Sequence, residues 1–311
     1  MAGSDGGRLM APAVVVLAGG SGGAKLARGM LDVVGDDLTV IANTGDDIEI
    51  YGAYVSPDPD LCTFWLADRI DERGWGLRDD SFAVMEGLRE LGADIWFALG
   101  DRDLAIAIER TRRIGEGATL TDTLADLGTA LGLRARVLPM SDEPVRTWVR
   151  VKGRWMPFQE FMISAGAEGP VDDVQLRGID DARPTTAALA AIAAADAIVV
   201  GPSNPVISIG PILAVPQMRQ ALIDSPAPIV AVSPVVGGAV LKGPTAAFMR
   251  WAGHAPSSDG IAEAYAGLID GLVADEPVDG LPVLQTDTLM RDAGDRRRLA
   301  QETLHFAEGL A

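Results

Sequence analysis

Short apolar runs alternate with helical patterns at both ends of the chain. Residues 13–19 (AVVVLAG) and 38–45 (LTVIANTG) are apolar runs of strand length, and the segment between them carries Leu26, Met30 and Leu31 at helical spacing. A second series of the same kind fills the last third of the chain and includes an expected helix from about residue 211 to residue 222. Buried strands separated by helices are typical of a parallel sheet that is covered on both faces. The pattern predicts an α/β fold on a doubly wound, mostly parallel sheet.

The middle of the chain has a different pattern. Between residues 60 and 133 nearly all apolar residues follow a 3.6-residue period, which predicts a mainly helical insertion. Residues 145–151 (VRTWVRV) and 154–163 (RWMPFQEFMI), joined at Lys152 and Gly153, predict a β-hairpin. The expected division is a disordered tail at 1–12, the doubly wound core at 13–59 and 134–311, and the helical insertion at 60–133.

Composition excludes several classes of protein. The formal charge of −18 argues against a nucleic-acid partner, because phosphate backbones are bound mainly through Lys and Arg. One cysteine and two histidines leave little for a disulfide, a zinc site or a His-based triad, so any metal should be a hard cation on carboxylates. The first residues lack the pattern of a signal peptide, and Asp196 interrupts the longest apolar stretch. We expect a cytoplasmic protein that does not enter a membrane.

The turn after the first apolar run, residues 19–25 (GGSGGAK), is rich in glycine. It is not a G-x-G-x-x-G fingerprint, because Lys25 stands where the third glycine should be. It is not a P-loop either, because Ala24 precedes the lysine and Leu26 follows it. Both motifs share a glycine turn whose N–H groups, with a helix N-terminus behind them, favour an anion. We expect a phosphate here, with Lys25 adding charge; the alternative is a turn that only lets strand and helix pack closely.

An acidic cluster follows the second apolar run. Residues 43–60 (NTGDDIEIYGAYVSPDPD) begin with Asn43 and Thr44 and contain Asp46, Asp47, Asp58 and Asp60. In an open α/β sheet, ligands lie beyond the carboxyl ends of the strands, where this cluster and the glycine turn both fall. Carboxylates would repel a nearby phosphate, and a bridging Mg²⁺ that binds both removes this repulsion. The alternative makes Asp46 and Asp47 turn formers and Asp60 a helix N-cap.

A third polar segment, residues 201–216 (GPSNPVISIGPILAVP), places Ser203 and Asn204 after an apolar run. Their hydroxyl and amide groups suit a nucleotide, and an Asx or ST turn that shapes the loop is the alternative. Residues 99–105 (LGDRDLA) and 233–238 (SPVVGG) are weaker signals of the same kind.

Taken in order, these segments resemble the CofD/FbiA family, the 2-phospho-L-lactate transferases of coenzyme F-420 biosynthesis, from about residue 14 to residue 290. The segments are LAGGSGGAK, IANTGDD, SPDPD, RGWG, ALGDRDLA, LPMSDEPV, FQEF, GPSNPVISIGPIL and AVSPVVGG. One departure is Pro59, where the family pattern has leucine.

The resemblance implies a Rossmann-like core with an accessory domain, in a homodimer. It implies an enzyme that moves a phosphoacyl group from a guanosine-diphosphate-linked donor to the terminal hydroxyl of the deazaflavin Fo, with release of GMP and with Mg²⁺ as cofactor. The implied donor contacts are Gly20, Ser21, Gly22, Gly23, Lys25, Ser203, Asn204 and Pro205. The implied catalytic and metal residues are Asp47 and Asp60, and the implied Fo contacts are Asn43, Asp60, Asp101 and Arg102.

Several alternatives stay open at this level. Asp60 is the candidate to orient or deprotonate the acceptor hydroxyl, and metal ligation with orientation is favoured over a general base. The transferred acid is phospholactate, phosphoenolpyruvate or phosphoglycerate. Two other functions compete: a sugar-nucleotide-binding regulator of the gluconeogenesis-factor type, and a nucleotidyltransferase, whose L-A-G-G-x-G-T-R-L turn this chain replaces with Gly23, Ala24 and Lys25.

Overall fold

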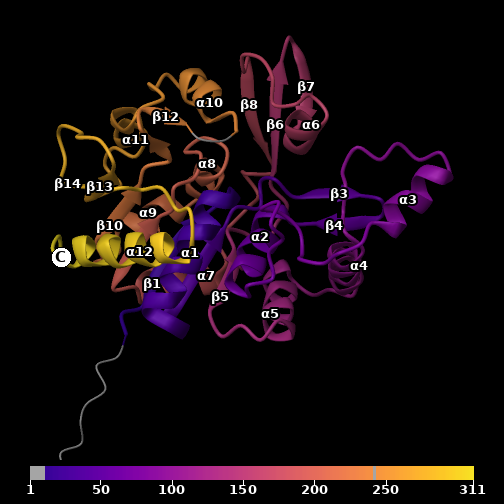
Figure 1. Cartoon of the computed structure of the whole chain (residues 1–311), viewed down its shortest axis with the longest axis horizontal. Helices are drawn as coiled ribbons and strands as arrows, with labels where there is room; N and C mark the ends of the chain where they lie inside the picture. Colours follow the sequence, from indigo (N-terminus) through magenta and orange to yellow (C-terminus); the bar gives the residue numbers. More distant parts are fainter. Residues whose placement is uncertain (1–10, 241–242) are drawn as a thin grey trace, which may run out of the picture.

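The centre of the computed structural model, which describes residues 11–240 and 243–311, is a seven-stranded sheet (Figure 1). Its strands run in the order β14-β13-β10-β9-β1-β2-β5, and neighbouring strands are parallel. They are β1 (Val14–Ala18), β2 (Leu38–Ala42), β5 (Arg136–Pro139), β9 (Ala197–Val200), β10 (Ile229–Val232), β13 (Gly271–Ala274) and β14 (Val283–Gln285). The predicted fold class is confirmed, whereas the predicted tail falls mainly on residues 1–10, outside the described residues.

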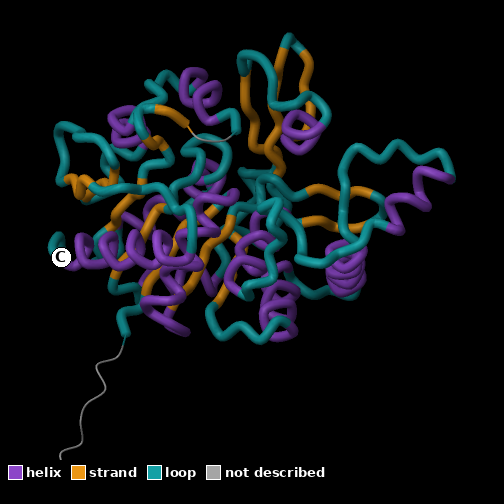
Figure 2. Tube along the Cα trace, in the orientation of Figure 1, coloured by secondary structure: helices purple, strands orange, loops and turns teal. Residues whose placement is uncertain are grey.

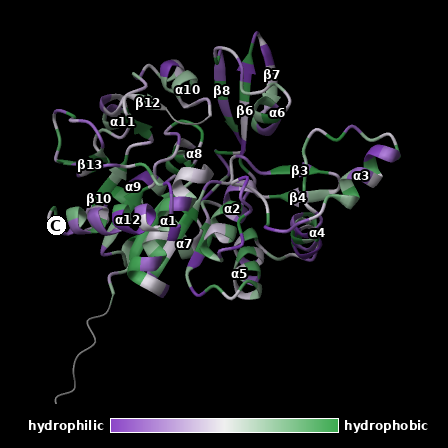
Figure 3. Cartoon of the chain, viewed as in Figure 1, coloured by the Kyte–Doolittle hydropathy of each residue, from purple (hydrophilic) through white to green (hydrophobic). Residues whose placement is uncertain are grey.

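Both faces of the sheet are apolar, because its central strands are continuous aliphatic runs (Figure 3). Val15 and Leu17 point to one face and Val14 and Val16 to the other. On the Val16 side lie α1 (Gly20–Val34), α2 (Pro57–Leu66) and α12 (Ala293–Glu308). On the Leu17 side lie α7 (Thr186–Ala193), α8 (Ile209–Ala214), α9 (Met218–Ile223) and α11 (Ser258–Ala264) (Figure 2).

The segment between β2 and β5 forms a lateral arm beside the sheet (Figure 1). It contains the hairpin β3 (Ile48–Ile50) and β4 (Ala53–Val55), followed by α2, α3 (Ala83–Glu90), α4 (Asp101–Gly115) and α5 (Leu120–Ala130). The hairpin, α3 and α4 share a small apolar core that includes Val55, Met85 and Leu104. Helix α2 instead packs on the central sheet through Cys62 and Leu66. The domain boundaries at 60 and 133 stay predictions.

The predicted β-hairpin is present but is shorter than expected. Strands β6 (Arg146–Val151) and β7 (Arg154–Pro157) meet at Lys152 and Gly153, and β8 (Asp173–Arg177) completes a three-stranded sheet. The second strand ends at Pro157, which has no N–H for a further ladder bond. Residues Phe158–Ile163 form helix α6, because its turn buries both Phe158 and Phe161 against Phe248.

One predicted helix is divided in two. The sequence pattern gave a helix from about 211 to 222, but α8 ends at Ala214 and α9 begins at Met218. Pro216 cannot donate a helical hydrogen bond, and Gln217 has a φ of 74° in the left-handed region. The remaining elements are η1 (Gly35–Asp37), β11 (Val235–Val236), β12 (Ala239–Val240) and α10 (Thr245–Trp251).

The order of the strands reverses at the centre of the sheet. From β1 the chain proceeds outward through β2 to β5, and from β9 it proceeds in the opposite direction through β10 and β13 to β14. The loops after β1 and β9 therefore diverge, and doubly wound folds bind ligands in the crevice at such a switch point.

Candidate functional site

A cavity of about 860 Å³ lies at this switch point, which is a typical volume for a small-molecule site. The loops after the central strands supply its polar lining, and the lateral arm and α6 supply most of its apolar lining. The apolar lining includes Trp75, Trp96, Phe97, Phe158 and Met162. The cavity is thus polar over the sheet and aromatic towards the arm.

The glycine turn presents the N-terminus of α1 to this cavity. The helix begins at Gly20, its N-cap residue Gly19 supplies no side-chain cap, and its first turn carries no acidic residue. Gly20 has a φ of 64° and its Cα faces open space, while Ser21, Gly22 and Lys25 also line the cavity. The Gly20 N–H donates to Asp58, and the rest of this glycine-rich first turn, beside a lysine, is an anion-binding arrangement. The Lys25 Nζ also lies 5.8 Å from the centre of the Trp65 ring.

Three glycines of the turn, Gly19, Gly22 and Gly23, are required by packing. A Cβ on Gly22 would lie 2.0 Å from the Pro202 carbonyl oxygen, and a Cβ on Gly23 would lie 2.7 Å from the Ser203 Oγ. These residues let the loop after β1 touch the loop after β9. The packing explanation of the turn therefore holds at these three glycines, whereas the open position of Gly20 suits a ligand.

Asn43 holds Asp58 in place. Its Nδ2 donates to Asp58 Oδ2 at 2.9 Å and to the Ile207 carbonyl at 3.3 Å, and its Oδ1 accepts from the Gly45 N–H at 2.8 Å. The other Asp58 oxygen accepts from the Gly20 N–H at 2.7 Å. The Asn43 side chain is fully buried and engaged within the protein, so it positions Asp58 and the glycine turn.

Asp46 and Asp58 form a pair of buried carboxylates at the cavity wall. Burial raises the pKa of Asp58 to about 6, and burial together with the charge of Asp58 raises the pKa of Asp46 well above its usual value. Asp46 Oδ1 has no hydrogen-bond partner among the described residues. Two desolvated carboxylates with a free oxygen fit the donor set that Mg²⁺ takes in addition to phosphate oxygens. The described residues contain no group of three or more potential metal ligands.

Asp47, one of the two predicted metal ligands, does not line the cavity. Its two oxygens accept hydrogen bonds from the Tyr54 hydroxyl and the Ser56 Oγ, both at 2.8 Å. Burial raises the pKa of Asp47 to about 7, and the positive charge of Arg146 offsets part of the shift. Its role as a metal ligand stays a prediction, and its contacts are those of a structural residue.

Asp60 does line the cavity, and its carboxylate forms an ion pair with Arg110 of α4. Both terminal guanidinium nitrogens donate to the two carboxylate oxygens, and the side chains of Arg110 and Asp60 are only 2% and 5% exposed. Burial raises the pKa of Asp60 while Arg110 opposes the shift. Ser56 is the N-cap of α2, so the N-cap interpretation of Asp60 is wrong. Arg110 was not among the predicted site residues. Its helical spacing could have indicated it, because Arg110 is a charged residue on the same buried face of α4 as Asp103 and Ala107.

The segment after Leu99 contributes Asp103 to the cavity wall instead of the expected Asp101 and Arg102. Asp101 caps α3, because its carboxylate accepts from the Ser81 Oγ and from the Val84 N–H, at 2.6 and 3.0 Å. Neither Asp101 nor Arg102 lines the cavity; Asp103, the next residue on α4, does. The predicted contacts of Asp101 and Arg102 with Fo stay untested.

The loop after β9 places Ser203 and Asn204 at the cavity wall, whereas Pro205 does not line the cavity. Asn204 Oδ1 accepts from the Val206 N–H at 2.9 Å, and its Nδ2 donates to the Thr245 Oγ1 at 3.2 Å. The Asx-turn interpretation is therefore correct for Asn204, which nevertheless contributes surface to the cavity.

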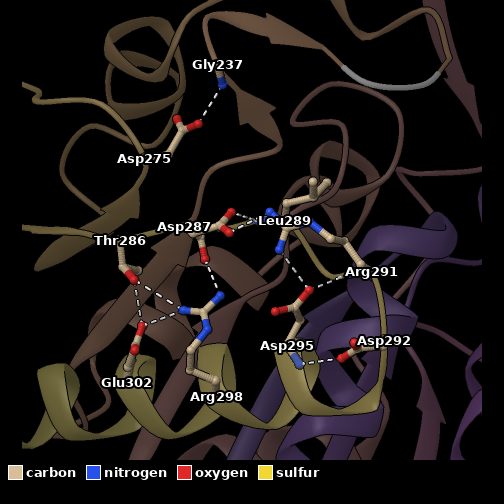
Figure 4. Close-up of polar contacts among 10 residues, drawn as sticks. All are labelled: Gly237, Asp275, Thr286, Asp287, Leu289, Arg291, Asp292, Asp295, Arg298 and Glu302. Carbon is tan, nitrogen blue, oxygen red and sulfur yellow. Dashed lines mark hydrogen bonds and ion pairs between the residues drawn. The ribbon is translucent and has the colours of Figure 1, made fainter.

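The loop between β14 and α12, which no sequence pattern indicated, also borders the cavity through Thr288, Leu289 and Met290. Figure 4 shows how it is held. Arg298 of α12 donates to the Asp287 carbonyl at 2.6 Å and forms an ion pair with Glu302 at 2.9 Å. The Asp287 carboxylate accepts from the Leu289 N–H at 2.9 Å and pairs with Arg291. Nearby, the Gly237 N–H donates to Asp275.

The model of one protein family, "2-phospho-L-lactate transferase CofD", matches residues 14–297. The chain belongs to this family. Named relatives support the assignment across nearly the whole chain. The 2-phospho-L-lactate transferase of Methanopyrus kandleri is 39% identical over 307 residues, which cover 96% of this chain and 98% of that protein. The 2-phospho-L-lactate transferase of Methanosarcina mazei is 37% identical, with 93% and 98% covered. The phosphoenolpyruvate transferase of Kitasatospora aureofaciens is also 37% identical, with 95% and 98% covered.

A crystal structure of a UPF0052 family protein from Bacillus halodurans has the same fold as this CofD family member. It superposes with a TM-score of 0.64 at 19% identity, covering 94% of this chain and 98% of that protein. Among the residues described, no helix is long and apolar enough to span a membrane.

Proposed function

We propose that this protein transfers a phosphoacyl group from a guanosine-diphosphate-linked three-carbon acid to the terminal hydroxyl of the deazaflavin Fo, with release of GMP. The observation that carries the proposal is the cavity of a CofD family member in which a glycine-rich helix N-terminus, buried carboxylates and an aromatic wall adjoin. These three parts match the diphosphate, the reacting hydroxyl and the planar ring of the two substrates.

The donor is assigned to the polar half of the cavity. The first turn of α1 and Lys25 bind the diphosphate, through N–H groups and one positive charge. Ser203 and Asn204 flank it from the loop after β9. The nucleoside then extends over β10 and β14, where Ser233 and the loop at 286–291 form the wall.

The acceptor is assigned to the half of the cavity beneath the arm. Its aromatic wall, with Trp75, Trp96 and Phe97, offers flat apolar surface to a deazaflavin ring. The hydroxylated side chain of Fo then points back towards Asp60 and the glycine turn. This placement brings the terminal hydroxyl to the donor phosphate without moving either substrate across the cavity.

In the transfer step the acceptor hydroxyl oxygen bonds to the phosphorus that carries the acid, the bond from that phosphorus to the oxygen of GMP breaks, and the hydroxyl proton passes to the phosphate of the departing GMP. Phosphoryl transfer requires in-line positioning and charge neutralisation more than covalent help. Asp60, fixed by Arg110, accepts a hydrogen bond from the hydroxyl and orients it. Lys25 and the α1 N–H groups bind the phosphate oxygens.

Mg²⁺ is proposed as the cofactor, with Asp46 and Asp58 as its protein ligands in preference to the predicted pair Asp47 and Asp60. Asp46 and Asp58 line the cavity and lie close enough for the charge of one to act on the other, whereas Asp47 does not line the cavity. When bound, the ion neutralises charge on the phosphate oxygens. The homodimer and the cytoplasmic location implied by the family are likewise proposals.

Incubation of the purified protein with Fo and a donor linked to GDP tests the function. Release of GMP supports the transferase. Release of pyrophosphate from GTP in place of GMP would indicate a nucleotidyltransferase, and tight nucleotide binding without turnover would indicate the regulator. Competition between the lactyl, enolpyruvyl and glyceryl donors identifies the acid.

A further inference from the structure

Asp103 on α4 is a buried carboxylate at the cavity wall that the proposed transfer does not use. The residue is 9% exposed, and its carboxylate oxygens accept no hydrogen bond from any residue in the described part of the chain. Its backbone N–H donates to Asp80 Oδ2 at 3.2 Å, which helps to begin α4 without involving the Asp103 side chain. Within the described ranges, the carboxylate therefore has no hydrogen-bond partner that explains its burial.

The charges around Asp103 make this burial costly. The negative charge of Asp60 lies nearby, and the cation that opposes it, Arg110, already pairs with Asp60 through both terminal nitrogens. Two buried carboxylates thus share one guanidinium. Burying an ionisable group without a dedicated partner is unfavourable, and side chains kept in this way are concentrated at functional sites.

Asp103 lies on the side of the cavity that the arm provides. Its Oδ2 is 4.0 Å from the point where a Cβ on Gly76 would lie, and Gly76 and Trp75 line the same cavity. The glycine turn, in contrast, comes from the central sheet. A ligand that contacts Asp103 therefore also contacts the aromatic wall, which is the part assigned to the acceptor.

We propose that Asp103 determines acceptor specificity by accepting hydrogen bonds from hydroxyl or ring N–H groups of a neutral, planar, hydroxylated acceptor. The inference rests on the proposed function. Such a ligand supplies the donors that the protein does not, whereas an anionic ligand at this place would face two carboxylates and be repelled. Asp103 thus selects for hydrogen-bond donors and against negative charge beside Asp60.

The test compares Asp103→Asn with Glu109→Gln, which removes a charge from an exposed position of the same helix. In Asp103→Asn the KM for Fo should rise at least about tenfold, because a charge-assisted hydrogen bond is lost. The KM for the donor should stay within about twofold of the wild-type value. The melting temperature of the ligand-free variant is unchanged or higher, because an unpaired buried charge has been removed. Glu109→Gln behaves as the wild type in all three measurements.

A wild-type KM for Fo in Asp103→Asn would overturn the inference and leave the proposed function intact. A lower melting temperature with both KM values raised would also overturn it, because that pattern belongs to a structural residue. A wild-type enzyme that neither binds Fo by fluorescence titration nor releases GMP would overturn the proposed function and this inference together.

Discussion

Arg110 of α4 forms a buried, bidentate ion pair with Asp60 of α2, which lies 50 positions earlier in the chain. Arg110 also donates to the Tyr54 carbonyl at 3.2 Å, so one side chain of α4 joins the β3–β4 hairpin to the acidic cluster. The arm that carries the aromatic wall is thereby fixed to the carboxylate proposed to orient the acceptor.

We predict that Arg110→Gln lowers the free energy of unfolding by about 3–5 kcal/mol, because it leaves the Asp60 charge buried and unpaired. The double variant Asp60→Asn with Arg110→Gln should lose less than the sum of the two single variants. Urea denaturation of the four proteins measures this coupling. Additive losses would show that the two side chains do not depend on each other.

The proposed metal ligands predict how strongly substitution of each of three neighbouring aspartates raises the Mg²⁺ requirement of the enzyme. Asp46→Asn and Asp58→Asn should each raise the Mg²⁺ concentration for half-maximal activity by at least about tenfold, since each removes a ligand charge. Asp47→Asn should change it far less, because Asp47 faces Tyr54 and Ser56. Titration of metal-free enzyme with MgCl₂ gives the order. A larger effect in Asp47→Asn, or full activity in EDTA, would refute the assignment.

The loop at 286–291 predicts a selective loss of donor binding in Arg298→Ala. Without the hydrogen bond to the Asp287 carbonyl, the wall beside the nucleoside loosens, so the Kd for GDP should rise about fivefold or more. The Kd for pyrophosphate, which reaches only the glycine turn, should stay unchanged. Arg297→Ala is the matched control, because Arg297 is exposed on the same helix. Calorimetric titration decides between them; equal losses for both ligands would contradict the nucleoside assignment.

Much of this fold follows from the sequence because buried parallel strands are continuous aliphatic runs. The run from Val14 to Ala18 leaves no polar position for an exposed face, strands β9 and β10 have the same pattern, and β2 departs from it only at the buried Thr39. The pattern could not locate the end of β7, because Phe158 and Phe161 suit both a strand and the turn of helix that buries them. The helical conformation of Phe158 and Phe161 depends on their packing against Phe248, which is distant in sequence.

The site was predictable by region more than by residue. The sequence pointed to the acidic cluster, but the direction of a carboxylate depends on partners such as Asn43 for Asp58 and Tyr54 for Asp47. In the segment after Leu99 the position of Asp103 at the cavity is set by the orientation of α4, which is a tertiary property. Long-range pairs of this kind leave no local pattern.

The buried acids predict how stability depends on pH. Burial raises the pKa of Asp47 and of Asp103 to about 7, well above the usual value of an exposed carboxyl. The folded state then binds more protons than the unfolded state across this interval, so stability falls as pH rises from 5 to 8. Urea denaturation of the ligand-free protein at both pH values should show this fall, with a smaller fall in Asp103→Asn. Equal stability at both pH values would contradict the raised pKa values.

The mass of the acceptor after incubation tests most directly whether the cavity joins a GDP-linked acid to Fo. Fo, the three donors in turn, Mg²⁺ and enzyme are incubated, and the products are measured by mass spectrometry. We predict that Fo gains the mass of one phosphorylated three-carbon acid, less one water, with one GMP formed per Fo consumed. We also predict that Asp60→Asn, although folded, forms almost none of this product. Fo that keeps its mass with every donor, while the enzyme is folded and binds GDP, would contradict the proposed transfer.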